Sequence, residues 1–255
     1  MSQWGFYFDQ TRCVGCKACM LGCKNWNDER RGDYNINKDS MNSTTDWWQE
    51  GSYIVSTGSS EKGSFYLNGL GETNYEQNRK YYMKEEWRRV SAHEYTSPLS
   101  VNYMSLSCNH CIKPACVKAC PMNIIYKEHD HGLVLVDNSS CISCGKCQGA
   151  CPWNAPQFYD KNFKSYSQSD PKRPKMTKCT MCFDRIQEGL KPACVAACLN
   201  RALDAGPIDE LRKKWESYGK HVVDNISMPS NEFASDYVES QNMITEPSIL
   251  FVKKE

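Results

Sequence analysis

The chain has 255 residues, a formal net charge of +1, a mean hydropathy of −0.66 and 16 cysteines, and these values exclude several classes of protein. It has no basic surplus for a nucleic-acid-binding protein, and no apolar run approaches the roughly 20 residues that a membrane-spanning helix needs. It is also longer than the small secreted domains that disulfides commonly stabilise.

The first predicted element is a short strand at Trp4–Asp9 that leads into a cysteine motif. Met1–Gln10 has no basic region followed by an apolar stretch, so we expect no signal peptide. The motif has the spacing of the cysteine runs that hold 4Fe-4S clusters in bacterial ferredoxins. It reads Cys13-x2-Cys16-x2-Cys19-x3-Cys23.

Residues 31–84 form a polar insertion without cysteine. A loop of this length without any structure is uncommon inside a domain, so the segment is expected to pack on the surface or to be ordered by a partner. A plain surface insertion is the preferred interpretation, and the aromatic pairs Trp47-Trp48 and Tyr81-Tyr82 keep the second alternative open, because Trp and Tyr are common at interfaces.

The middle of the chain holds two motifs in tandem. We expect a strand at Asn102–Leu106 before them and a hairpin of Ile124–Tyr126 and Leu133–Val136 between them. The motifs read Cys108-x2-Cys111-x4-Cys116-x3-Cys120 and Cys141-x2-Cys144-x2-Cys147-x3-Cys151. In two-cluster ferredoxins the fourth cysteine of each run ligates the cluster of the other run. This rule assigns Cys108, Cys111, Cys116 and Cys151 to one cluster, and Cys120, Cys141, Cys144 and Cys147 to the next.

A polar segment at 160–178 is expected to link this inner pair to a fourth motif, Cys179-x2-Cys182-x11-Cys194-x3-Cys198. Part of the chain is repeated there, because Lys113–Cys120 and Lys191–Cys198 differ at a single position. The same exchange rule assigns Cys13, Cys16, Cys19 and Cys198 to one outer cluster, and Cys23, Cys179, Cys182 and Cys194 to the other. All 16 cysteines are then used, and we predict four 4Fe-4S clusters.

Two other uses of the cysteines fit the motifs less well. Zinc is the stronger alternative, because two C-x2-C pairs can supply four thiolates to a tetrahedral site. Zinc ribbons separate their pairs by a loop, however, whereas three of these motifs crowd four cysteines into a short segment. A disulfide framework does not require such regular spacing.

Beyond the last motif we expect a helix that starts near Pro207 and contains Glu210–Trp215, an irregular tail at Lys220–Thr245 and a final strand at Ile249–Val252. The expected fold class is α+β, with tandem ferredoxin-like halves, long loops and little regular secondary structure. The predicted parts are an outer half (1–30 with 170–205), the insertion (31–84), an inner half (100–160) and a C-terminal helix and tail (206–255). No catalytic motif is present, so no substrate chemistry is expected in this chain.

Bound clusters would change the charge of the chain. Sixteen thiolates contribute about −16 and four oxidised cores roughly +8, so the holoprotein is expected near −7. Basic residues near the ligands should offset part of this charge and help set reduction potentials, although about half are expected to be ordinary solvated side chains. They are Lys17, Lys24, Lys113, Lys118, Lys146, Lys178 and Arg185. His110 is not needed as a ligand, but its imidazole is placed to hydrogen-bond a cluster sulfur.

About three quarters of the chain resembles the four-cluster iron-sulfur subunits of the DMSO reductase family of molybdenum oxidoreductases, and within it the anaerobic DMSO reductase branch. The resemblance rests on stretches that accompany the motifs: Gly5–Asp9, Ser107–Cys111, Lys178–Arg185 and Arg201–Arg212. The chain departs from the family in the insertion at about 32–84 and at Leu199, where a proline usually follows the last cysteine.

The resemblance implies an electron relay between a molybdopterin-containing catalytic subunit and a membrane anchor that exchanges electrons with quinol. The cluster of Cys13, Cys16, Cys19 and Cys198 would face the catalytic subunit, and the inner pair would lead towards the quinol side. Substrate, direction of electron flow and the choice of molybdenum or tungsten are left open. The expected location is the extracytoplasmic side of a membrane by co-export with a partner, with a cytoplasmic location as the alternative. The alternative functions are a free-standing polyferredoxin and a zinc-dependent interaction module.

Overall fold

The computed structural model describes residues 2–27, 53–56, 64–66, 87–96, 99–153, 155–158, 174–224 and 245–254. At 53–56, 64–66, 91–96 and 99–100 only the backbone is described. Most of the predicted insertion, residues 160–173 of the predicted linker and residues 225–244 of the predicted tail lie outside this part of the chain.

Both ends of the sequence meet in a three-stranded sheet of order β10-β1-β11. The central strand β1 (Trp4–Asp9) pairs antiparallel with β10 (Leu203–Pro207) and parallel with β11 (Ile249–Val252). The structure therefore confirms the strands predicted at both ends. Because side chains alternate along a strand, Phe6 and Phe8 enter the main core, whereas Tyr7 packs on the opposite face.

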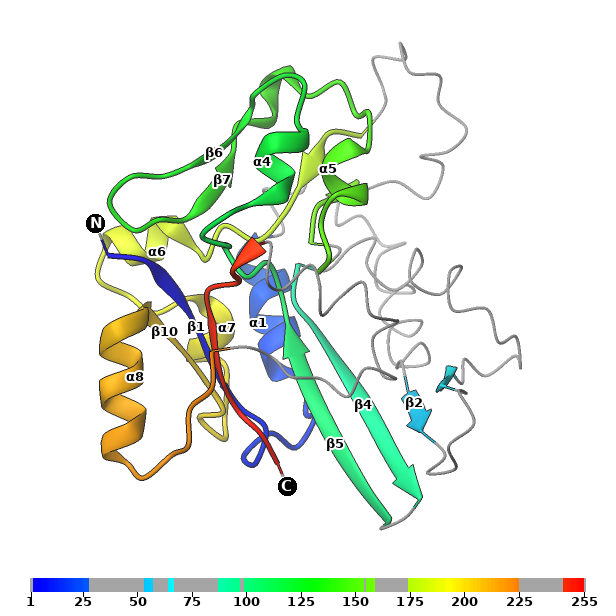
Figure 1. Ribbon diagram of the computed structural model, residues 1–255, viewed down its shortest axis with the longest axis vertical. Coiled ribbons are helices and arrows are strands. Elements are labelled where there is room, and N and C mark those ends of the chain that lie inside the picture. Colours follow the sequence, from blue (N-terminus) through cyan, green and yellow to red (C-terminus); the bar gives the residue numbers. More distant parts are fainter. Residues whose placement is uncertain are drawn as a thin grey trace.

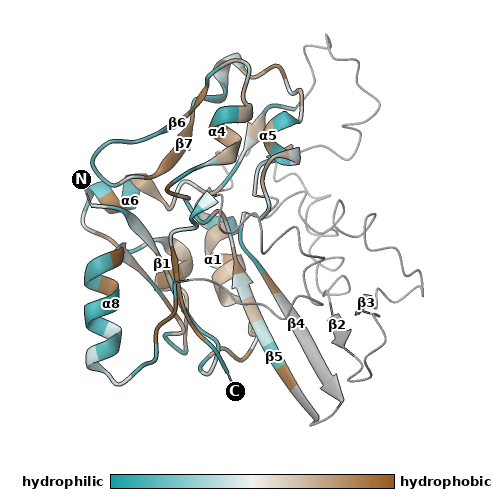
Figure 2. Ribbon diagram, in the orientation of Figure 1, coloured by the Kyte–Doolittle hydropathy of each residue, from teal (hydrophilic) through white to brown (hydrophobic). Residues whose placement is uncertain are grey.

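Helix α8 (Ile208–Ser217) covers the Tyr7 face of this sheet, as Figure 1 shows. Its Leu211 and Trp215 are buried, and the rest of the helix is largely hydrophilic (Figure 2). This one-sided burial explains why a mostly polar segment forms a stable helix. The helix predicted after Pro207 is confirmed.

On the other face, α1 (Ala18–Asn27) packs against the short helix α7 (Ala193–Ala196). The two helices approach so closely that a Cβ atom on Gly22 would lie 2.7 Å from the Cβ of Ala197. Only glycine allows this contact without displacement of the backbone. Short helix α6 (Phe183–Gln187) lies within the fourth motif, between Cys182 and Cys194.

A second unit lies beside this sheet, at the top of Figure 1. It contains the antiparallel hairpin of β6 (Ile125–Lys127) and β7 (Val134–Val136), the helices α4 (Ala115–Ala119) and α5 (Lys146–Gly149), and a 3-10 turn at Asn138–Ser140. The hairpin confirms the sequence prediction. The core of this second unit includes Ile125, Val134 and two cysteines.

A longer hairpin of β4 (Arg89–Thr96) and β5 (Leu99–Leu106) extends away from the core and includes the strand predicted at Asn102–Leu106. Within the predicted insertion, β2 (Tyr53–Ser56) pairs with β4, and β3 (Ser64–Tyr66) pairs with β2. Strands β8 (Gln157–Phe158) and β9 (Met176–Thr177) also pair. The end of the predicted linker, Met176–Thr177, is therefore a strand. Its Met176 is buried in the core of the second unit.

The mixture of helices and strands agrees with the α+β prediction, whereas the division into two ferredoxin-like halves stays a prediction. Among the described residues, no helix is both long and apolar enough to cross a membrane.

Candidate iron-sulfur sites

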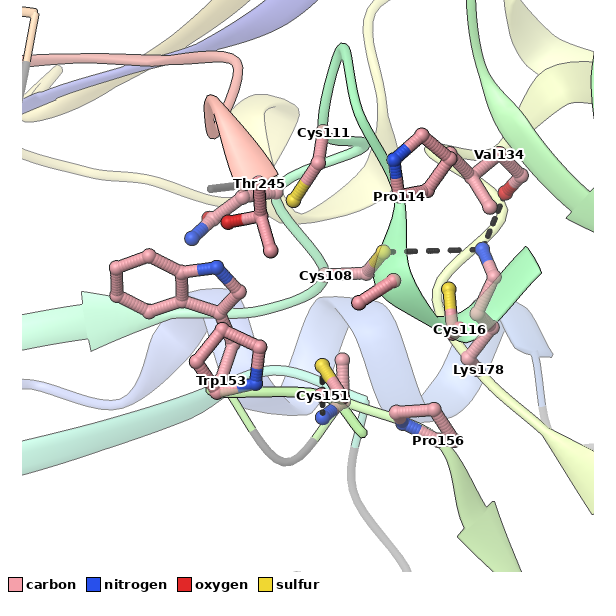
Figure 3. A pocket seen from close by; sticks show the side chains of 14 residues that line it. Cys108, Cys111, Pro114, Cys116, Val134, Cys151, Trp153, Pro156, Lys178 and Thr245 are labelled. Atoms are coloured by element: carbon pink, nitrogen blue, oxygen red, sulfur yellow. Dashed lines mark hydrogen bonds between the residues drawn. The ribbon is translucent and has the colours of Figure 1, made fainter. Parts of the chain in front are cut away.

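Three cavities are each lined by four cysteines from two different motifs. The cavities enclose about 340, 360 and 300 Å³ of empty space, part of it open to solvent. We name their cysteines group 1 (Cys13, Cys16, Cys19 and Cys198), group 3 (Cys108, Cys111, Cys116 and Cys151) and group 4 (Cys120, Cys141, Cys144 and Cys147). Figure 3 shows the four sulfurs of group 3 facing a common space.

The remaining cysteines, Cys23, Cys179, Cys182 and Cys194, are all buried, and we name them group 2. The Nδ2 group of Asn27 donates to the carbonyl oxygen of Cys23 at 2.8 Å and lies 3.8 Å from its sulfur. Burial raises the pKa of Cys182, and repulsion from Cys194 adds to this rise, whereas a hydrogen bond from the Asn27 side chain opposes it. The structure places the cysteines of groups 1, 3 and 4 around shared cavities, and the ligation of one cluster by each of the four groups stays a prediction.

Backbone N–H groups donate to cysteine sulfurs at equivalent places in different motifs. Two donors lie two residues after the first cysteine of a motif, and two lie four residues after the last. The pairs are Ser143 with Cys141 (3.4 Å), Met181 with Cys179 (3.3 Å), Ala155 with Cys151 (3.5 Å) and Ala202 with Cys198 (3.3 Å). Such bonds stabilise negative charge on sulfur, as cluster ligation requires.

Left-handed backbone turns position several of these donors. Met181 and Cys182 have φ of 57° and 50°, and Ser143 has φ of 55°. Residues other than glycine adopt this conformation rarely, and it clusters at functional sites where the surroundings enforce it. The turn reverses the chain around the first sulfur of the motif and aims the next N–H at it.

Burial raises the pKa of several cysteine thiols. It reaches about 11 for Cys13 and Cys116, and about 12 for Cys147, Cys151 and Cys179. The thiolates that iron requires must therefore be stabilised by the bound metal, so that cluster binding is coupled to proton release and to folding. Four cysteine thiols around one cavity are the donor set of a 4Fe-4S cluster, and the residues that line the cavities of groups 1, 3 and 4 fit that group.

Electrostatic repulsion relates cysteines of different groups. After burial, repulsion from Cys194 helps to raise the pKa of Cys19, which relates groups 1 and 2. After burial, repulsion from Cys108 helps to raise the pKa of Cys179, which relates groups 2 and 3. Repulsion from Cys116 likewise helps, after burial, to raise the pKa of Cys147, which relates groups 3 and 4. The groups are therefore neighbours in the order 1, 2, 3, 4.

Two buried cations lie among these groups. The sequence singled out Lys178, which is 1% exposed, but not Arg88, which is 2% exposed. Among the other predicted basic residues, Lys113 pairs with Glu246 at the surface, Lys118 and Lys146 are exposed, and Arg185 lies over Trp26. Lys17 and Lys24 are partly buried.

His110 is fully buried between two cysteines of group 3. Its Nδ1 accepts a hydrogen bond from the backbone N–H of Val134 at 3.1 Å, so the ring proton lies on Nε2. Burial holds the pKa of His110 well below its usual value, and the ring is neutral. Within the described residues Nε2 has no partner, so a donor is left for the predicted bond to a cluster sulfur.

The sequence profile of the 4Fe-4S dicluster domain family matches residues 99–208. The B subunit of anaerobic dimethyl sulfoxide reductase from Haemophilus influenzae is 36% identical over 216 residues, which cover 84% of this chain and 79% of the relative. The Escherichia coli K12 protein of the same name is 36% identical over 213 residues, with coverages of 84% and 78%. The perchlorate reductase subunit beta of Dechloromonas aromatica is 30% identical over 230 residues, with coverages of 82% and 66%. The chain is therefore a 4Fe-4S electron-transfer protein that belongs to the family of the iron-sulfur subunits of anaerobic DMSO reductases.

Proposed function

We propose that this chain carries four 4Fe-4S clusters and relays electrons between a molybdopterin-containing catalytic subunit and a membrane anchor that exchanges electrons with quinol. The clusters supply one-electron storage when bound, and the chain holds, insulates and orders them. The observation that carries this proposal is the arrangement of twelve cysteines in three groups of four, each around one cavity, while the other four cysteines are all buried. Reductases of sulfoxides or related respiratory acceptors are the expected complexes.

In this proposal each group ligates one cluster, and the relay runs in the order 1, 2, 3, 4. The pairs Cys19 with Cys194, Cys108 with Cys179, and Cys116 with Cys147 support this order, because each joins two consecutive groups. The burial of the cysteines supports the same order, with groups 1 and 4 at its two ends. Group 2 is wholly buried, whereas Cys16 of group 1 is exposed and three of the four cysteines of group 4 are partly exposed.

Groups 1 and 4 are therefore the places where electrons would enter and leave. Exposed apolar side chains lie beside both groups, as partner docking requires. Val14 and Leu199, next to cysteines of group 1, are 59% and 78% exposed, and Met122 and Ile142 at the cavity of group 4 are 42% and 48% exposed. We assign group 1 to the catalytic subunit and group 4 to the anchor.

The chain has no active site of its own in this proposal, and it reaches the membrane through its partners. Co-export with a signal-bearing partner would place it on the extracytoplasmic side, and a cytoplasmic location is the alternative.

The first test is the content of Fe, Mo, W and Zn in protein purified anaerobically from its native source under mild conditions. About 16 Fe per chain, together with about one Mo or W, is the expected result. Further iron would belong to a partner that has its own cluster. Iron without Mo or W, in a chain that runs as a monomer, would favour a free-standing polyferredoxin. Zinc in place of iron would overturn the proposal.

A further inference from the structure

Arg88 lies where groups 1 and 2 meet. Its guanidinium donates to the hydroxyls of Ser105 at 3.1 Å and Ser107 at 2.9 Å, and it lies 4.4 Å from the ring centroid of Phe6. The Ser105 hydroxyl in turn lies 3.5 Å from the sulfur of Cys19 in group 1. Arg88 is thus held in one position by two hydroxyls and one ring.

The electrostatic surroundings of Arg88 come from both groups. Burial lowers the pKa of its guanidinium, but the sulfurs of Cys194, Cys19, Cys179 and Cys23 outweigh burial and raise the pKa above its ordinary value. Three of these cysteines belong to group 2 and one to group 1. A guanidinium remains charged in proteins, so a fixed positive charge lies between the two groups.

Lys178 occupies the corresponding place between groups 2 and 3. It precedes Cys179 of group 2 in sequence, and its ammonium group lies 3.7 Å from the sulfur of Cys108 in group 3. The ammonium also donates to the carbonyl oxygens of Val134 and of Cys179, the latter at 3.0 Å. Figure 3 shows the bonds to Cys108 and Val134.

Within the part of the chain that the structure describes, neither cation pairs with a carboxylate. An isolated buried charge is strongly unfavourable, so buried cations are normally paired with an anion. Among the described residues, the groups beside Arg88 and Lys178 that would carry negative charge are cysteine sulfurs, which become thiolates when a cluster is bound. An oxidised 4Fe-4S centre with its four thiolates carries a net charge of about −2, and reduction adds one more negative charge.

We propose that Arg88 and Lys178 are positioning residues that fix a positive charge at two successive junctions of the relay, Arg88 between groups 1 and 2 and Lys178 between groups 2 and 3. The inference rests on the proposed assignment of one cluster to each group. A fixed cation stabilises the reduced, more negative centre beside it. Each cation therefore raises the reduction potentials of its two neighbouring centres, and group 2 is influenced by both.

The test is an EPR-monitored redox titration of the intact complex, purified anaerobically. Lys178→Met removes the charge but keeps an unbranched side chain, and it is expected to lower the potentials of groups 2 and 3. Arg88→Met is expected to lower those of groups 1 and 2. The expected shift changes the ratio of reduced to oxidised centre at least tenfold, or 59 mV for a one-electron couple. Group 4 is expected to keep its potential in both variants, and Cys120→Ser identifies its signal.

Lys146→Met is the matched control. Lys146 also adjoins a proposed ligand, Cys147, but its side chain is exposed and solvent screens its charge. Its removal is expected to leave all four potentials within the error of the titration. The proposal would be overturned if the potentials of groups 1, 2 and 3 stayed unchanged in the Arg88→Met and Lys178→Met variants. It would also be overturned if Lys146→Met shifted the potentials by the same amount as these variants.

The charge-retaining variants Lys178→Arg and Arg88→Lys separate charge from shape. Each is expected to keep four centres at potentials close to those of the wild type, even if the methionine variant loses iron. Loss of iron from the charge-retaining variants as well would assign these residues a packing role and overturn the inference. Fewer than four titrating centres in the wild type would instead contradict the proposed function itself.

Discussion

The phenol ring of Tyr7 lies parallel to the indole ring of Trp215, with ring centroids 4.2 Å apart and an interplanar angle of 0°. This contact joins the central strand β1 to α8, on the side of the sheet away from the cysteines. Trp215→Ala is expected to lower the free energy of unfolding by about 3–5 kcal/mol, because it removes a large buried side chain. Chemical denaturation of the anaerobic holoprotein measures the change.

Tyr218→Ala is the control for this prediction. Tyr218 follows α8 and is 68% exposed, so its removal is expected to change the free energy of unfolding by no more than about 0.5 kcal/mol. Equal losses in the two variants would show that the stack does not stabilise the protein. Iron content is expected to stay unchanged in both.

The exchange of fourth cysteines between the inner motifs predicts reciprocal effects. Cys120→Ser is expected to damage the cluster of Cys141, Cys144 and Cys147, although those residues lie 21 or more positions further along the chain. Cys151→Ser is expected to damage the cluster of group 3 instead. EPR spectra of the two reduced variants distinguish the centres, and loss of the opposite centre in each variant would refute the exchange.

The sequence predicts the cysteine groups and the strands at both ends because these signals are local. Motif spacing is set by the geometry of ligation, and Trp4–Asp9 and Ile249–Val252 are short apolar stretches that suit a buried strand. By contrast, the strand at Met176–Thr177 has no such signal. It forms because Gln157–Phe158 offers a partner, and that pairing is a property of the folded chain.

The burial of Arg88 is the clearest example of a feature that cannot be predicted from the sequence. Arg88 and Arg89 are identical neighbours, yet Arg88 is buried and Arg89 only partly so. The difference arises because Ser105, Ser107 and Phe6 surround the first guanidinium. These residues come from distant parts of the chain, so local pattern cannot identify which arginine enters the core.

The close contact between α1 and α7 predicts that Gly22 cannot be replaced. A methyl group on Gly22 would lie 2.7 Å from the Cβ of Ala197 and 3.1 Å from the carbonyl oxygen of Ala193. Gly22→Ala must therefore push apart two helices that carry cysteines of groups 1 and 2. We expect partial loss of iron, seen as weaker EPR signals from these two centres.

Gly149→Ala is the matched control, because Gly149 lies in helix α5 and a Cβ atom there meets no neighbour within 4 Å. We expect its iron content to equal that of the wild type. If Gly22→Ala also retained all its iron and its stability, the helix contact would be less rigid than the structure indicates.

The buried carboxylate of Asp204 predicts a pH dependence of stability. Burial opposes its ionisation, but hydrogen bonds from Lys191 and Lys214 outweigh this effect and hold the pKa below its usual value. The lysine nitrogens lie 2.8 and 2.6 Å from the carboxylate oxygens. Because the pKa is lower in the folded state, the ion pairs stabilise the protein above the unfolded-state pKa of about 3.9, and this contribution is lost as the pH falls through the folded-state value.

Asp204→Asn is therefore expected to lower the free energy of unfolding by about 1 kcal/mol between pH 5 and 8, a modest value because solvent screens both lysines. Below about pH 4 the difference between wild type and variant should shrink. Urea midpoints compared pairwise at each pH measure it, since acid loss of iron affects both proteins alike. A difference that grew on acidification would contradict the assignment.

Removal of iron should unfold most of the chain. Many cysteines belong to the hydrophobic core, and the mean hydropathy of −0.66 leaves little other apolar material to replace them. Without clusters, the cysteine-lined cavities lose the groups that join their walls, so the free energy of metal binding is also free energy of folding. After anaerobic chelation, circular dichroism is expected to show loss of secondary structure, and iron with sulfide should restore it. A chelated chain that still unfolded cooperatively in urea would show that the apolar contacts around Tyr7 and Phe8 suffice for the fold.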